Sequence, residues 1–321
     1  MSRAEVAAEP PPPEPARARA YGTDTGRFFV IAEPGMAGAR LARLAEEAWS
    51  VWSGPLALPP RWTSAVTVRL TPAGRWAFAE TGWRVVVEPG GVVSVWIRGD
   101  DALAADAITR ERRWLTALAE GALRRQAAAL AIAPERTIVP DWLTVAAAEA
   151  VLVRGNPALG DEWRRVARAA AVLPSLRETL NWAGAQTADG AEAERRWLAA
   201  YGVWLWLQAE AGRGPAWRRL VTGLLEGVSP GLALVRGYEP RFAAAEARDI
   251  ELAWQVGAAA QAVLRTVPTW PAAESRRRLE QAARVTVRPL AGETEEAKEL
   301  AELWAERGDP LLTSVRRARL A

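Results

Sequence analysis

Apolar residues recur with two different periods along the chain, and the period changes near residue 100. Before that point, short β-branched or aromatic runs are separated by turn residues, a pattern typical of strands. One segment in this part, Ala39–Trp52, has apolar side chains three and four residues apart and predicts a helix. Pro89-Gly90-Gly91 predicts a hairpin turn between the last two runs. The predicted strands are 28–31, 66–70, 83–88 and 92–98.

After residue 100 the pattern is helical almost throughout. Asp100 and Asp101 can cap a long helix that continues to Ala131. The sequence therefore predicts an α+β fold, mostly α overall, in which a small mixed β-sheet with a helix precedes a larger helical part. The further predicted helices are 141–154, 161–171, 173–182, 191–211, 216–226, 230–236, 240–265, 272–284 and 294–307.

These changes of pattern predict four parts of the chain. Residues 1–26 are expected to form a disordered tail, since the run Pro10-Pro11-Pro12-Pro13 favours an extended polyproline spacer. Residues 27–100 form the sheet subdomain and residues 101–265 the helical subdomain. Residues 266–321 form a charged, helical C-terminal extension.

The N-terminal stretch also bears on the compartment. Met1–Ala20 is rich in proline and alanine, with three acids and three arginines, and it lacks the basic segment and apolar core of a secretory signal. No stretch has the length of uncharged apolar residues that a bilayer-spanning helix needs. We therefore expect a cytoplasmic protein by default, or an exported or envelope-associated one if the native N-terminus lies further upstream.

The absence of two residue types restricts the possible chemistry. The chain has no histidine and no cysteine. This excludes Ser-His-Asp and thiol catalysis, haem ligation by histidine, disulfides, and zinc sites made from imidazole or thiolate. Carboxylate pairs, lysine or tyrosine chemistry and oxygen-only metal sites remain. We expect no cofactor, no metal ion and no enzymatic activity.

Charged and aromatic residues add little evidence for a ligand. The net charge is +3, and acids are interleaved with several arginine runs, including Arg110-Glu111-Arg112, so nucleic acid is not an expected partner. Runs such as Arg218-Arg219 are interpreted as solvated helix faces. The 17 tryptophans, against 4 phenylalanines, are mostly at helical spacing and are expected in the core. The better candidates for surface tryptophans are Trp62, Trp76 and Trp270.

Visible pairs of acids stand at or near predicted helix N-termini. A carboxylate at such a position is expected for capping alone, without any catalytic role. The pairs are Asp100 with Asp101, Asp141 with Glu149, and Asp161 with Glu162.

Three segments resemble the gluzincin metallopeptidases, a family with a zincin-like fold in which a small sheet leads into a helix carrying the motif HExxH. The first segment is 115–123, which is similar to that active helix. The second, 139–145, is similar to the family's Pro-x-Trp-Leu-x-Glu-Gly segment. The third comprises the stretch 199–202 around Tyr201, the stretch 229–235 and the Glu251-Leu252-Ala253-Trp254 sequence, which are similar to the later part of these domains.

The resemblance places the family's functional residues on positions that cannot perform its chemistry. The two zinc histidines correspond to Ala117 and Gly121, the catalytic glutamate to Leu118, and the third zinc ligand to Val145. None of these side chains has a donor atom for zinc or accepts a proton. The resemblance therefore implies a catalytically inactive pseudo-metallopeptidase.

In active relatives a strand beside the active helix pairs with the substrate backbone. The resemblance therefore implies a scaffolding role or the binding of a protein or an extended peptide by strand addition. The oligomeric state is left open. The expected binding residues are Val92, Val93, Ser94, Val95, Trp96 and Tyr201.

Two other interpretations remain open. Ala117 and Gly121, four residues apart, can equally mark a close helix–helix contact in an unrelated interaction or structural protein that uses exposed tryptophan and arginine surfaces. The third possibility is an enzyme that uses two facing carboxylates.

Overall fold

The computed structural model describes most of the chain, and its residues form an α+β fold that is mostly helical. The chain consists of two compact units, Met1–Leu264 and Arg265–Ala321. No described helix combines the length and the apolar character needed to cross a membrane. The described residues are 18–33, 36–59, 62–78, 82–99, 107–168, 173–185, 190–209, 213–263, 284–287 and 296–299.

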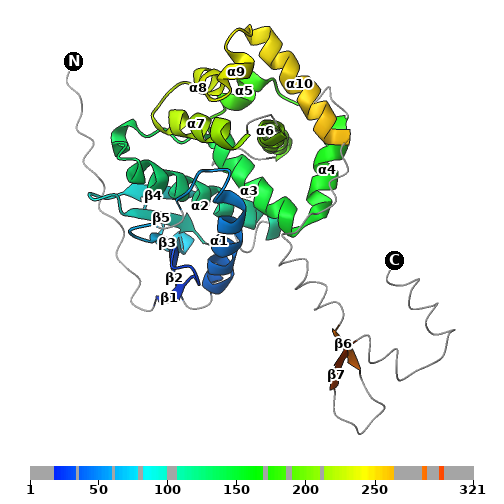
Figure 1. Cartoon of the computed structure of the whole chain (residues 1–321). Coiled ribbons are helices and arrows are strands. Elements are labelled where there is room, and N and C mark those ends of the chain that lie inside the picture. Colours follow the sequence, from blue (N-terminus) through cyan, green and yellow to red (C-terminus); the bar gives the residue numbers. More distant parts are fainter. Residues whose placement is uncertain are drawn as a thin grey trace, which may run out of the picture. The chain divides into compact units, whose positions relative to one another are not determined.

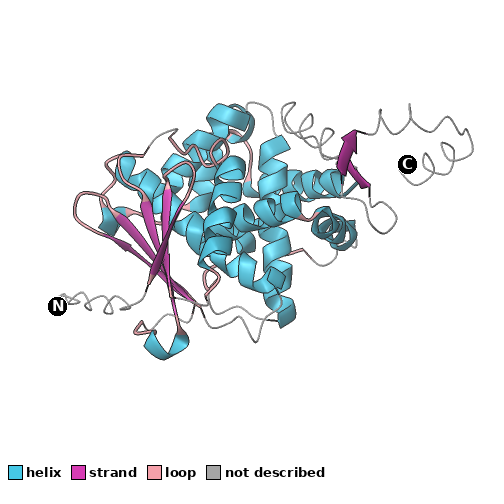
Figure 2. Cartoon of the chain, turned by 90° about the horizontal axis from the view of Figure 1, so that it is seen from below, coloured by secondary structure: helices cyan, strands magenta, loops and turns pink. Residues whose placement is uncertain are grey.

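The first unit contains a five-stranded mixed sheet with the strand order β1-β2-β3-β5-β4. Strands β2, β3 and β5 are parallel, whereas β1 and β4 pair antiparallel at the two ends. One row across the sheet aligns Val30, Val68, Val95 and Val85, and the helices pack on this apolar face (Figure 2). The strands are β1 (Arg19–Gly22), β2 (Phe28–Ala32), β3 (Val66–Thr71), β4 (Trp83–Val87) and β5 (Val93–Arg98).

The helices confirm most of the sequence pattern. Helix α6 is drawn nearly end-on in Figure 1, with α3, α4, α5, α7 and α10 around it. Short 3₁₀ turns lie at Ala73–Arg75 and Pro134–Arg136. The helices are α1 (Gly38–Trp52), α2 (Ala107–Ala129), α3 (Asp141–Gly155), α4 (Pro157–Arg168), α5 (Leu176–Leu180), α6 (Gly190–Ala209), α7 (Arg213–Leu225), α8 (Pro230–Gly237), α9 (Glu239–Phe242) and α10 (Ala247–Val263).

Strand β1 contacts the first helix, α1, near the N-terminus. Strand β1 lies within the predicted tail, so the prediction of an unstructured segment is wrong for residues 19–22. The strand has only one large apolar residue, Tyr21, and its sequence shows no alternation. Tyr21 lies so close to Gly38 at the start of α1 that no side chain fits on that glycine. Pairing with β2 and this close approach therefore stabilise β1.

The other corrections concern helix continuity. The predicted helix at 240–265 is two helices, because the backbone N–H of Glu246 donates to the Asp249 side chain (3.2 Å) and begins α10 anew. In the second unit, β6 (Arg284–Val287) pairs antiparallel with β7 (Glu296–Glu299). The helix predicted at 294–307 is therefore wrong for 296–299, where β-branched residues of β6 supply the partner strand. The predicted helix at 272–284 lies almost entirely outside the described residues.

Candidate functional site

Helix α2 presents its small residues to the sheet. Gly121 faces β5, where a Cβ atom would overlap Cγ2 of Val95 and lie 3.5 Å from Cγ1 of Val66. Ala117 precedes Gly121 by one helical turn and is fully buried, as is Leu118. Gly121, one of the two positions that the resemblance assigns to zinc histidines, therefore marks a close contact between α2 and the sheet.

A zinc ion does not fit these residues. Val145 lies in α3, which packs against α2, and its side chain is buried among apolar neighbours. Ala117, Gly121 and Val145 offer only carbon atoms, and Gly121 has no room for an imidazole. Among the residues that the structure describes, no group of three or more acids could hold a metal ion. These residues therefore supply no zinc chemistry.

A polar cluster joins α2, α3 and α6 instead. The Arg112 guanidinium, which is partly buried, forms an ion pair with the buried Glu149, and it also stacks over the ring of Trp197 at 4.4 Å. Tyr201 is buried nearby and packs edge-on against Trp163, with ring centroids 5.9 Å apart. Burial, followed by the charge of Glu149, raises the pKa of the Tyr201 hydroxyl, so it stays neutral. The predicted binding residue Tyr201 therefore lies inside the helical part.

Strand addition at the predicted binding residues requires 92–98 to be an edge strand, and the sheet contradicts this requirement. Strand β5 pairs with β3 on one side and with β4 on the other. Val93, Ser94, Val95 and Trp96 are buried, and their backbone groups serve the two ladders. Val92 belongs to the hairpin turn, where its carbonyl accepts from Glu88 N–H at 2.8 Å. An extended peptide cannot pair with this strand.

The edge beside α2 is β4. No other strand of the described residues pairs with β4 on the side away from β5, and α2 packs against both strands. Trp83 donates its indole N–H to Glu120 of α2 (2.8 Å), which fixes the strand to the helix. The residue pattern does not distinguish the two strands, because β4 and β5 each have one apolar residue, Val86 and Trp96, on their second face.

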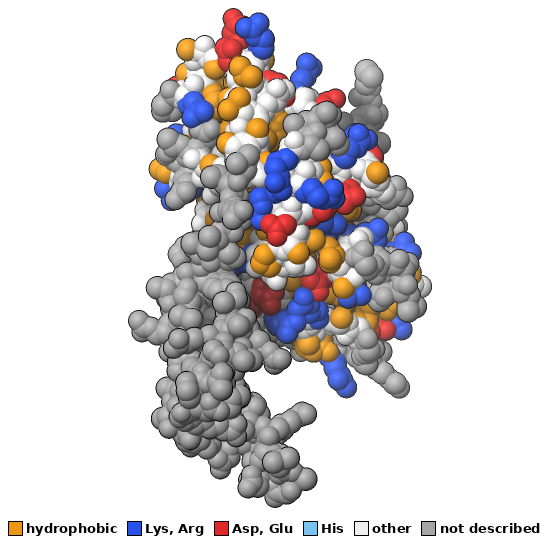
Figure 3. All heavy atoms as spheres, turned by 90° about the vertical axis from the view of Figure 1, so that its right-hand side faces the viewer, with side chains coloured by type: hydrophobic (Ala, Val, Ile, Leu, Met, Phe, Trp, Pro, Cys, Tyr) orange, Lys and Arg blue, Asp and Glu red, His pale blue; other side chains and the backbone are white. Residues whose placement is uncertain are grey.

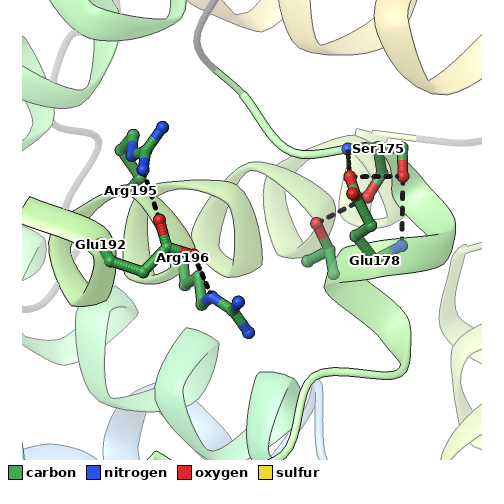
Figure 4. A network of polar contacts seen from close by, with 6 residues as sticks. Ser175, Glu178, Glu192, Arg195 and Arg196 are labelled. Atoms are coloured by element: carbon green, nitrogen blue, oxygen red, sulfur yellow. Dashed lines mark hydrogen bonds and ion pairs between the residues drawn. The ribbon is translucent and has the colours of Figure 1, made fainter. Parts of the chain in front are cut away.

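A second candidate site is a hollow between α5 and α6. Two adjoining hollows, of about 280 and 510 Å³, share Glu178, Trp182 and Arg196. Figure 4 shows two groups of contacts here. Glu192 lies between Arg195 and Arg196, whereas Glu178 closes the N-terminus of α5 through Ser175. The Ser175-Leu176-Arg177-Glu178 sequence is a capping box, a local signal that the helical pattern of apolar residues did not reveal.

The two carboxylates of this hollow do not suit acid–base catalysis. Hydrogen bonds from Ser175 lower the pKa of Glu178, and those from Arg196 and Arg195 lower the pKa of Glu192. Both groups are therefore ionised near neutral pH, whereas a general acid needs a raised pKa. This pair offers no support for a carboxylate enzyme.

The acid pairs noted in the sequence are also engaged elsewhere. Asp141 accepts from the backbone N–H groups of Gly184 (2.6 Å) and Ala185 (2.8 Å), which fixes the α5–α6 connection to α3. Asp161 and Glu162 pair with arginines of their own helix. The pair Asp100 with Asp101 lies outside the described residues.

Charges and tryptophans match the expected structural roles in the part of the chain that the structure describes. Figure 3 shows acidic and basic side chains intermixed on the face that it draws. Trp62 and Trp76 are partly exposed, and Trp62 packs edge-on against Phe28 and Trp49. Trp270 lies outside the described residues. The largest buried side chains include Trp52, Trp142, Trp163, Trp206, Trp217 and Trp254.

The hollow between α5 and α6 and the edge of β4 differ in whether their polar groups already have partners. The hollow between α5 and α6 already pairs its own charges, whereas β4 leaves backbone groups directed outward at the end of the sheet. The edge of β4 is therefore the better candidate for binding. No protein-family model matches this chain, and a search of curated proteins finds no match either.

Proposed function

We propose that this chain is a non-catalytic, gluzincin-like domain that binds an extended segment of a partner protein by strand addition at β4. The observation that carries the proposal is the position of β4 at the end of the sheet, beside α2. The order of sheet, α2 and α3 supports the gluzincin resemblance. The absence of histidine and cysteine supports a loss of peptidase chemistry.

The hydrogen-bond ladder determines which groups face a partner. Glu88 N–H donates to Val92 (2.8 Å), and Arg98 N–H donates to Gly82 (3.0 Å). In an antiparallel pair the bonded positions alternate, so Val86 exchanges its bonds with Ser94 of β5. Val85 and Val87 therefore direct their N–H and C=O groups away from β5, where an added strand would find them.

The composition of β4 supports a binding role for this edge. Soluble proteins usually protect an edge strand with charges, proline or a bulge. The sequence Trp83-Arg84-Val85-Val86-Val87 contains one charge and no proline, and its last four residues are partly exposed. An apolar and regular edge of this kind favours pairing with another chain. A second copy of the chain is the alternative partner.

Substitution of Val87 tests the proposal. Val87→Pro removes an outward N–H and leaves the β4–β5 bonds of Val86 in place. Val87→Thr is the matched control, because it keeps the N–H and the β-branched shape. The probe is a panel of capped extended peptides of about seven residues, starting with alternating valine and threonine. Binding is measured by fluorescence anisotropy.

We expect the wild-type chain and Val87→Thr to bind the same members of the panel, and Val87→Pro to lose them. Circular dichroism and thermal unfolding verify that the proline variant is folded. Equal binding by all three chains would reject the β4 edge, and binding of no peptide would reject the proposal. A dimer that Val87→Pro dissociates would instead identify the second copy as the partner.

A further inference from the structure

A separate hollow of about 350 Å³ lies between α7 and α8, away from the sheet. The two helices approach closely because small residues meet at their contact. A Cβ atom on Gly237 would lie 3.0 Å from Cβ of Leu220, and one on Gly223 would lie 3.6 Å from Cβ of Ala233. This close packing brings arginines from both helices to the rim of one hollow.

The charges around the hollow are unbalanced. Its lining includes Arg218, Arg219 and Arg236, against a single acid, Glu226. Arg219 is held in place, since its guanidinium donates to the backbone oxygen of Gly237 (2.7 Å). Arg218 and Arg236 are exposed, and among the described residues neither forms an ion pair. By contrast, Arg195 and Arg196 of α6 share the carboxylate of Glu192.

We propose that this hollow binds a small phosphate-bearing molecule, a site distinct from the β4 edge. Three guanidinium groups within one hollow can donate to several oxygens of a phosphate dianion, for which arginine is well suited. Val228 and Ala233 supply an apolar wall for the organic part of the ligand. The volume is near the lower end for small-molecule sites, which favours a compact ligand.

Glu226 is the one acid among the described residues of the lining, so its removal should change anion affinity in the opposite direction to removal of an arginine. Its carboxylate lies on the wall of the hollow and repels an anion bound there. Removal of this charge should tighten the binding of a phosphate, whereas removal of an arginine charge should weaken it. A hollow that serves no anion would show neither response.

The test titrates phenyl phosphate into the full chain by isothermal calorimetry, with benzoate and inorganic phosphate as comparison probes. The variants are Arg218→Gln combined with Arg236→Gln, and Glu226→Gln alone. Arg43→Gln on α1 is the control, because Arg43 is exposed and paired with Glu47. All substitutions are on the surface, and thermal unfolding verifies the fold of each variant.

We expect phenyl phosphate to bind more tightly than either comparison probe. The double arginine variant should lose about tenfold or more in affinity, Arg43→Gln should match the wild type, and Glu226→Gln should bind more tightly. No detectable binding to the wild type, or equal binding by the double variant, would overturn the site. Benzoate binding as tight as phenyl phosphate binding would overturn the phosphate assignment.

Discussion

Substitution of Gly121 by alanine measures whether α2 and the sheet meet as closely as the structure shows. The new Cβ would lie closer than 3.0 Å to Cγ2 of Val95, on a fully buried β-branched residue of a central strand. A glycine-to-alanine change favours a helix by about 1 kcal/mol. Overpacking of a rigid core costs about 1–3 kcal/mol. Since Val95 has little freedom to move, we expect a net loss of about 2 kcal/mol in the free energy of unfolding.

The assay is urea unfolding followed by circular dichroism. Gly231→Ala in α8 is the matched control, because no atom lies within 4 Å of its added Cβ. The control should be neutral or slightly stabilising. Val95→Ala removes the overlapping methyl group, so the double variant Gly121→Ala with Val95→Ala should show a favourable coupling of about 1–2 kcal/mol. A Gly121→Ala variant as stable as the control would refute this packing. It would then be possible that space for a ligand exists beside Gly121.

Three further predictions concern charge and metal. Arg112→Leu should lower the free energy of unfolding by about 3 kcal/mol in urea unfolding, because it leaves Glu149 buried without its partner. The lowered pKa values of Glu178 and Glu192 mean that their contribution to stability is complete above the ordinary glutamate pKa and is lost as the pH falls below it. Urea unfolding between about pH 7 and 3 should therefore show a smaller acid-induced loss for Glu178→Gln than for the wild type. Stoichiometric zinc should leave the thermal unfolding midpoint of the dialysed chain unchanged, and a clear upward shift would contradict the proposed loss of the metal site.

Local patterns of residues predicted most of the elements correctly. The β-branched runs identified β2 to β5, and the helical spacing of apolar residues identified α1, α3, α6, α7 and α8. The glycines of the β4–β5 turn, Gly90 and Gly91, have positive φ values of 85° and 78°. A side chain rarely adopts such values, which is why a glycine pair is a reliable turn signal. These features depend on neighbouring residues alone.

Features that depend on distant residues were missed. Strand β1 has no apolar alternation of its own and exists through pairing with β2. The hairpin pairs β4 with β5 whichever of the two is central. The earlier strand β3 pairs with β5 and makes it the central one, so the hairpin alone did not show which strand was central. Two local signals were also missed: the capping box at Ser175 marks the start of α5, and the Asp249 side chain accepts a hydrogen bond at the start of α10.

The same distinction applies to the candidate sites. The absence of histidine and cysteine follows from composition alone, and it limits the chain to carboxylate, lysine, tyrosine or oxygen-ligand chemistry. The contact of Gly121 with Val95 depends on the three-dimensional arrangement, because nothing in the helix shows which face meets the sheet. The hollow between α7 and α8 likewise depends on how closely the two helices approach.

Amide hydrogen exchange, resolved by residue, tests strand addition at β4 most directly. The measurement compares the chain alone with the chain bound to a peptide selected from the extended panel. We predict that exchange slows at Val85 and Val87, whose N–H groups point outward, and changes little at Val86, whose N–H already bonds to β5. Peptide binding that leaves the exchange of Val85 and Val87 unchanged would contradict the proposed mode of recognition.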